Sequence, residues 1–106
     1  MLYDVRTYVC RPGTIKAHLA LYEQYGLEAQ KRHLGEPVAY MQTETGNVNS
    51  YIHIWLYKDA QDRAQRRAAM QADPEWIAFM KRSAEAGYLQ SQNNQLMTAV
   101  SFFKPK

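Results

Sequence analysis

The order of strand-like and helix-like segments constrains the fold of this chain more than any other feature. Residues 2–10 predict a strand, because side chains that favour strands recur at every second position, namely Tyr3, Val5, Thr7 and Val9. The residues that follow, Arg11, Pro12 and Gly13, favour a turn. A helix is then predicted from the capping residue Thr14 to about residue 34, with an apolar stripe of Ile15, Leu19, Tyr22 and Ala29.

A β-hairpin is predicted in the middle of the chain. Residues 37–45 and 48–57 both favour strands. Gly46 and Asn47 lie between them and favour a tight turn. The two strands should therefore pair with each other in antiparallel fashion.

The second half of the chain predicts more helix and a last strand. Asp59 is suited to cap a stretch that is rich in alanine and arginine. Asp73, followed by Pro74 and an acidic residue, indicates that the helix begins again there, and Gly87 favours its end. The final segment is polar at first and becomes strand-like from about residue 96.

Together these segments predict an α+β, ferredoxin-like fold of the order βαββαβ. In this fold both helical regions cover one face of a four-stranded antiparallel sheet. A chain of 106 residues is the size of one domain, so we expect a single domain over residues 1–106.

The strand at residues 48–57 has two faces of different chemistry. Its aliphatic face is Ile52, Ile54 and Leu56, which we expect to form the core with Trp76 and Phe79 of the last helix. Its other face, Tyr51, His53, Trp55 and Tyr57, is expected to lie on the side of the sheet that has no helices. Because such an aromatic face rarely meets water, we expect a homodimer, or an assembly of dimers, in which two sheets pack into a dimeric α+β barrel and enclose a cavity.

A candidate ligand site follows from the same alternation. Five side chains should share the enclosed face, namely Arg6, Tyr8, Tyr40, His53 and Trp55. Arg6 could hold an anionic oxygen, or it could form a buried ion pair with Asp4 or Glu44. His53 is a weak candidate for catalytic proton transfer, or a histidine that is only hydrogen-bonded within an interface. The aromatic side chains could line a ligand or could simply pack.

Other classes of function find little support in the sequence. The net charge of +3 is small and arginines alternate with acids, so Arg63, Arg66 and Arg67 are expected at the surface or an interface and nucleic acid is not an expected partner. No apolar run is long enough for a membrane span.

The cysteine content and the start of the chain bear on location. With one cysteine, Cys10, and no secretory leader, the expected location is the cytoplasm. His18 and His33 lie about four helical turns apart and cannot bind one metal ion together, and a two-histidine site would need His53 as well, so no metal site is expected. His33 is expected to cap a helix end. No cofactor is expected.

Four stretches of the chain resemble the NIPSNAP family. They are Tyr3-Asp4-Val5-Arg6-Thr7-Tyr8 with residues 11–14, Lys31-Arg32-His33-Leu34-Gly35, Ile52-His53-Ile54-Trp55-Leu56-Tyr57, and residues 63–69 with 73–76. Asp4 departs from the glutamate that the family pattern has at this position. The resemblance implies the dimeric α+β barrel superfamily, whose members include cofactor-free monooxygenases, haem-degrading enzymes and small-molecule isomerases.

Two functions of different class remain open from the sequence. One is a homodimer whose cavity binds an aromatic or enolisable organic anion, with or without turnover. The other is a non-catalytic interaction or scaffold protein, in which the aromatic face only forms the dimer. A cavity of about 300 Å³ or more that touches both Arg6 and His53 would favour the first.

Overall fold

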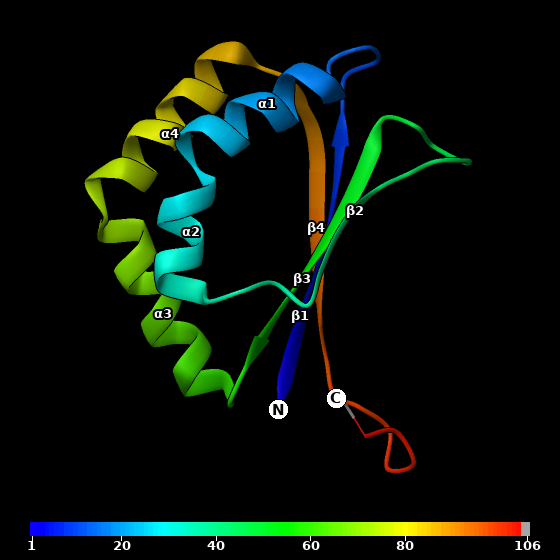
Figure 1. Cartoon of the computed structure of the whole chain (residues 1–106), viewed down its shortest axis with the longest axis vertical. Coiled ribbons are helices and arrows are strands. Elements are labelled where there is room, and N and C mark those ends of the chain that lie inside the picture. The colour runs from blue at the N-terminus through cyan, green and yellow to red at the C-terminus, as the bar shows by residue number, and fades with distance from the viewer. Residues whose placement is uncertain (105–106) are drawn as a thin grey trace.

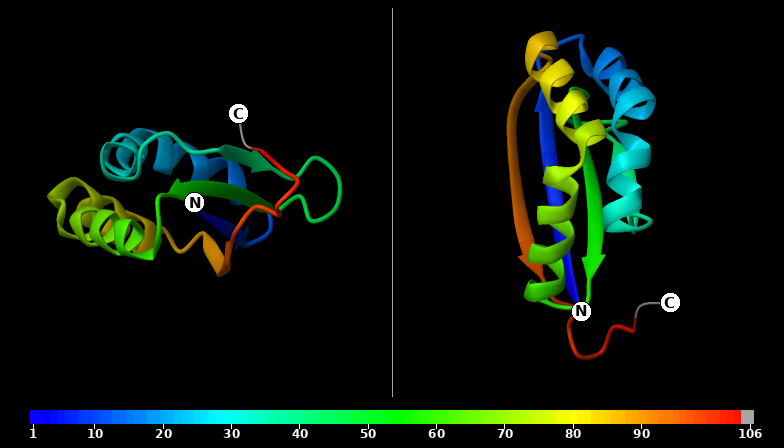
Figure 2. Two further views of the ribbon diagram at one scale, coloured as in Figure 1. Left: turned by 90° about the horizontal axis from the view of Figure 1, so that it is seen from below. Right: turned by 90° about the vertical axis from the view of Figure 1, so that its left-hand side faces the viewer.

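The structure, a computed structural model, describes residues 1–104 and has the predicted α+β, ferredoxin-like architecture (Figure 1). Its strands form one four-stranded antiparallel sheet in the order β2-β3-β1-β4. The helices lie on one side of this sheet, and its other side carries no helix (Figures 1 and 2). The elements, in chain order, are β1 (Leu2–Cys10), α1 (Ile15–Tyr25), α2 (Leu27–Leu34), β2 (Ala39–Gln42), β3 (Ser50–Tyr57), α3 (Ala60–Ala72), α4 (Pro74–Ala86) and β4 (Leu89–Met97).

The first helical region is two helices and not the single helix that the sequence predicted. Gly26 ends α1, where its N–H donates to the carbonyl of Tyr22, and it is also the residue from which α2 begins. Gly26 is buried against α4. A side chain at position 26 would push the α1–α2 junction away from α4. The break between the two helices therefore lies at a residue that must have no side chain.

The predicted helix caps in the second half are confirmed. The carboxylate of Asp59 accepts a hydrogen bond from the N–H of Asp62 at the start of α3. The carboxylate of Asp73 accepts one from the N–H of Glu75, directly after Pro74. Side-chain oxygens at these positions satisfy N–H groups that a helix leaves unpaired. Gly87 ends α4 in the left-handed conformation, with φ of 65°.

The last strand begins earlier than the sequence predicted. β4 covers residues 89–97, and its side chains are mostly polar and exposed. It pairs with β1 along one edge of the sheet. Backbone hydrogen bonds hold an edge strand without any requirement for alternating apolar side chains, and for this reason the hydropathy pattern did not reveal it.

The prediction of which sheet face meets the helices was wrong. Tyr51, His53, Trp55 and Tyr57 are all buried beneath the helices, whereas Ile52, Ile54 and Leu56 are half-buried on the side without helices. Trp76 and Phe79 therefore pack with aromatic rings and not with the three aliphatic residues. The observed core cluster is Leu34, Trp55, Tyr57 and Met70, with Tyr40 and Trp76 packed against it.

The polar character of the helices explains this reversal. Their inner faces carry buried His18 and Gln30, together with Arg63, which reaches a buried carboxylate. Such groups need hydrogen-bond partners when they leave water. The hydroxyl and imidazole groups of the aromatic face can supply partners, as can the carboxylate of Asp4, which pairs with Trp55 on the neighbouring strand β1. An aliphatic face cannot.

No helix within residues 1–104 combines the length and the apolar character that crossing a bilayer demands.

Candidate functional site

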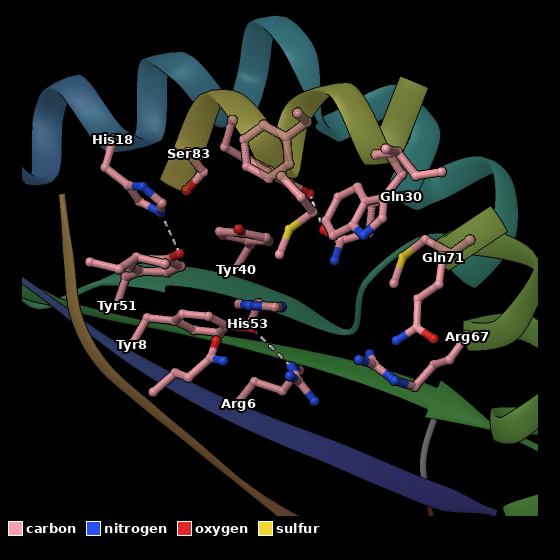
Figure 3. Close-up of a pocket in the computed structure, with 18 residues that line it drawn as sticks. Arg6, Tyr8, His18, Gln30, Tyr40, Tyr51, His53, Arg67, Gln71 and Ser83 are labelled. Carbon is pink, nitrogen blue, oxygen red and sulfur yellow. Dashed lines mark hydrogen bonds between the residues drawn. The ribbon is translucent and has the colours of Figure 1, made fainter. Parts of the chain in front are cut away.

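A cavity of about 480 Å³ lies between the sheet and the helices (Figure 3). The sheet contributes to its lining mainly Arg6 and Tyr8 from β1, Tyr40 from β2, and Tyr51 and His53 from β3. The helices contribute polar groups from above, among them His18, Gln30, Arg67 and Gln71. The cavity is thus walled by tyrosine rings and has cationic groups at one end.

Four rings form a stacked floor on the sheet. His53 stacks on Tyr8 with ring centroids 4.9 Å apart, and on Tyr40 with centroids 4.7 Å apart. Tyr51 is nearly parallel to both tyrosines, with interplanar angles of 9° and 10°. The stack follows from the register, since Tyr40 pairs with His53 and Tyr8 pairs with Tyr51 on neighbouring strands.

Polar contacts next to this floor join helix α1 to the sheet and to helix α2. His18 Nε2 lies 2.7 Å from the hydroxyl of Tyr51, and the hydroxyl of Tyr22 donates to Gln30 Oε1. Burial lowers the pKa of His18 and raises the pKa of Tyr22 and of Tyr51. All three groups are therefore neutral near pH 7, and the helix-to-sheet junction carries no charge here.

Arg6 is held at the cavity by a buried carboxylate. Asp4 is fully buried, and its Oδ2 lies 3.2 Å from Arg6 Nη1 and 3.1 Å from Arg63 Nε. Asn94 donates to Asp4 Oδ1 at 2.9 Å. Burial by itself raises the pKa of Asp4, but the Asn94 hydrogen bond and the two guanidinium groups outweigh it and hold the pKa below its usual value. The buried ion pair considered as an alternative role for Arg6 is thus present, and Arg6 also lines the cavity.

Trp55 stands behind His53 and is not part of the lining. The two residues lie two positions apart on the same face of β3, and the indole Nε1 donates to His53 Nδ1 at 2.5 Å. Burial, followed by the positive charge of Arg6, lowers the pKa of His53 to about 3. The imidazole is therefore neutral at physiological pH, and its Nδ1 is already occupied by a protein donor.

The five residues proposed from the sequence occupy one side of the sheet. Arg6, Tyr8, Tyr40 and His53 line the cavity together, and Trp55 contacts it only through His53. The expected location between two sheets of a dimer is wrong, because the cavity lies under the helices of the same chain. The alternation of side chains along a strand predicts correctly which residues share a face of the sheet. It does not predict which of the two faces the helices cover.

The sequence analysis missed the helical half of the lining. Arg63 and Arg67 were expected at the surface or an interface, yet Arg63 binds the buried Asp4 and Arg67 lines the cavity. Only Arg66 matches the expectation, as an exposed residue that pairs with Asp62 at 2.9 Å. The sequence does contain a pattern that indicates the inward position of these arginines. Arg63, Arg67 and the apolar Met70 recur at helical spacing, which places them on one face of the helix.

The structure gives His33 a partner in another helical region. His33, in the last turn of α2, binds the carboxylate of Asp73 at 2.7 Å and so joins α2 to the start of α4. Over residues 1–104, histidine, cysteine and acidic side chains nowhere gather in a group of three or more that could hold a metal ion.

Comparison with known proteins places this geometry in a family. The NIPSNAP family model matches residues 3–104. A NipSnap homologue from Dictyostelium discoideum is 30% identical over 76 residues, which are 72% of this chain but only 33% of that protein. The chain thus spans about a third of the length of that relative.

Solved structures agree with the family match. A NIPSNAP family protein of unknown function from Agrobacterium tumefaciens is 39% identical and superposes with a TM-score of 0.89, over 97% of this chain and 91% of that one. An antibiotic biosynthesis monooxygenase, 20% identical with a TM-score of 0.64 over 94% of this chain and 99% of that one, shares the fold alone. The chain belongs to the NIPSNAP family.

Proposed function

We propose that this NIPSNAP family protein binds a flat organic anion in the cavity between its helices and its sheet. The observation that carries the proposal is the contact of one cavity, about 480 Å³ in volume, with both Arg6 and His53. Ligand cavities for small molecules usually have volumes of about 300–1,000 Å³. A filled core would have favoured the alternative, in which the aromatic residues only pack.

The chemistry of the lining supports an anionic and flat ligand. Arg6 and Arg67 bring two guanidinium groups to the same end of the cavity (Figure 3). The carboxylate of Asp4 engages Nη1 of Arg6, which leaves Nη2 without a partner among residues 1–104. Rings of tyrosine line the remainder and offer stacking surfaces. An aromatic or enolisable acid matches both parts of this lining.

Binding of 2-naphthoate, measured by calorimetry and by thermal shift, tests the proposal. The matched probe is 2-naphthylmethylammonium, which has the same ring system and the opposite charge. We expect saturable binding of the anion and no binding of the cation. Equal binding of both, or of neither at millimolar concentration, would contradict the proposal.

A second candidate function, self-association as an interaction protein, has its own supporting observation. The sheet face without helices presents half-buried apolar side chains, which include Val5, Ile52, Ile54 and Leu56. Apolar faces of this kind are typical of interfaces. This second proposal retains the homodimer but builds it from the aliphatic face, since the aromatic face is covered by helices.

Light scattering at micromolar concentration tests the homodimer. Ile54→Arg, in the middle of the aliphatic face, should produce a monomer because it would bury an unpaired charge. Ala68→Arg, at an exposed position of α3 outside the cavity lining, is the matched control and should not change the mass. A monomeric wild-type protein would rule out the homodimer without affecting the proposal for the cavity.

A further inference from the structure

The hydrogen bond between Trp55 and His53 determines which proton the imidazole carries. An indole N–H can only donate. Since Trp55 Nε1 lies 2.5 Å from His53 Nδ1, the lone pair of Nδ1 must face it. A doubly protonated imidazole would bring two N–H groups together, so the geometry requires a neutral ring whose single proton is on Nε2.

The surroundings of His53 keep the ring in this state. Trp55 is fully buried and the exposed fraction of His53 is 2%, so neither side chain can exchange this contact for water. Tyr8 and Tyr40 stack on the ring and restrict its rotation. Four titratable or charged groups act on it, namely Arg6, Asp4, Arg67 and His18. Asp4 favours an imidazolium, but burial and the positive charge of Arg6 outweigh it.

The Nε2–H group has no acceptor among residues 1–104, although His53 lines the cavity. The charged groups of this lining are the guanidiniums of Arg6 and Arg67, which can only donate. Three donors therefore converge on one end of the cavity, and the complementary group is an oxygen that accepts several hydrogen bonds.

We propose that Trp55 fixes His53 as a hydrogen-bond donor, so that the cavity selects ligands by an anionic acceptor oxygen, as in a carboxylate or an enolate, and does not use His53 as a base. This inference rests on the proposed function, because it names the ligand group that the same cavity would hold. Trp55 is a positioning residue here, since it acts through His53 and does not line the cavity.

Nitrogen-15 NMR of the histidine-labelled full chain tests the tautomer without any ligand. Long-range proton–nitrogen spectra distinguish a protonated Nε2 from a protonated Nδ1. We expect the Nε2–H tautomer for His53 in the wild type and its partial loss in Trp55→Phe, which removes the indole N–H and keeps a smaller aromatic ring at this buried site. An Nδ1–H tautomer in the wild type would overturn the inference, even if 2-naphthoate binds and the proposed function stands.

A second experiment measures the affinity for 2-naphthoate of two variants of His53. His53→Leu removes the donor and should weaken binding about 10- to 100-fold, the range expected for a hydrogen bond to a charged group. His53→Gln retains an N–H donor and should remain within about threefold of wild type. Val48→Ala, at an exposed site outside the cavity, is the control.

The outcomes separate the two proposals. Equal affinities of the leucine and glutamine variants would overturn the role of His53 as a donor. Failure of 2-naphthoate to bind the wild type at millimolar concentration would overturn the proposed function, and with it the selection of an anionic oxygen. The tautomer measured by NMR distinguishes this second failure from the first.

Discussion

Gly26 lies directly against the ring of Phe79, so that a Cβ atom at position 26 would come within 3.0 Å of two ring carbons. Phe79 is buried and is itself in edge contact with Tyr22 and tilted contact with Trp76. The ring therefore has little room to move away. The junction of α1 and α2 depends on this close approach to α4.

Gly26→Ala is expected to destabilise the protein by about 1–2 kcal/mol, because overpacking a tight core outweighs the better helix propensity of alanine. Urea unfolding of the variant measures this loss. Phe79→Leu provides the control, since a smaller side chain should make Gly26→Ala less costly in the double variant. Additive losses would mean that the two residues are not in tight contact.

Asp4→Asn is expected to cost about 3 kcal/mol of folding stability, because it leaves Arg6 and Arg63 without the charge that they share in a buried site. Chemical denaturation measures the change. Arg66→Gln is the control, since it breaks only the pair with Asp62 on the surface of α3 and should cost under about 0.5 kcal/mol. Similar losses for the two variants would show that Asp4 is not the centre of a buried network.

The order of elements was predictable from the sequence because turns, caps and periodicity are local properties. Asp73 and Gly87 illustrate this, since each performs its capping role within a few residues of chain. The covered face of the sheet was not predictable, because it depends on which distant groups need partners. His18 meets Tyr51 and Arg63 meets Asp4 across more than thirty residues, and no pattern within β3 reports these contacts.

The candidate site was predictable in the same partial way. Alternation along β1 and β3 grouped Arg6 with His53, and the register does place them opposite each other. The contribution of the helices required knowledge of how α3 is rotated against the sheet. The inward position of Arg67 could have been predicted from its spacing to Met70. Because arginine is charged, a solvent-exposed position was the simpler expectation.

Folding stability should fall as the pH falls from about 6.5 toward 3. Burial and Arg6 lower the pKa of His53 to about 3, and burial lowers the pKa of His18. In the unfolded chain both bind protons near pH 6.5, so that acid favours the unfolded state. Each such group contributes a slope of up to about 1.4 kcal/mol per pH unit between its two pKa values.

Urea unfolding between pH 4 and 7.5 measures this slope. His53→Gln removes one titrating group, so the dependence of its unfolding free energy on pH should be shallower than in the wild type. His33→Gln is the comparison, since His33 is more exposed and binds Asp73 at the helix junction. An unchanged slope in His53→Gln would show that His53 is not held neutral by the fold.

Arg67→Ala is expected to weaken binding of 2-naphthoate about tenfold or more, because the guanidinium of Arg67 lines the same end of the cavity as that of Arg6. Arg66→Ala is a closely matched control, since it removes the same charge one residue away, from an exposed side chain that pairs with Asp62. Calorimetry at two salt concentrations measures both. A long-range effect of net charge would weaken the two variants alike and would fade in high salt, whereas direct contact in the cavity predicts a loss for Arg67→Ala alone that persists.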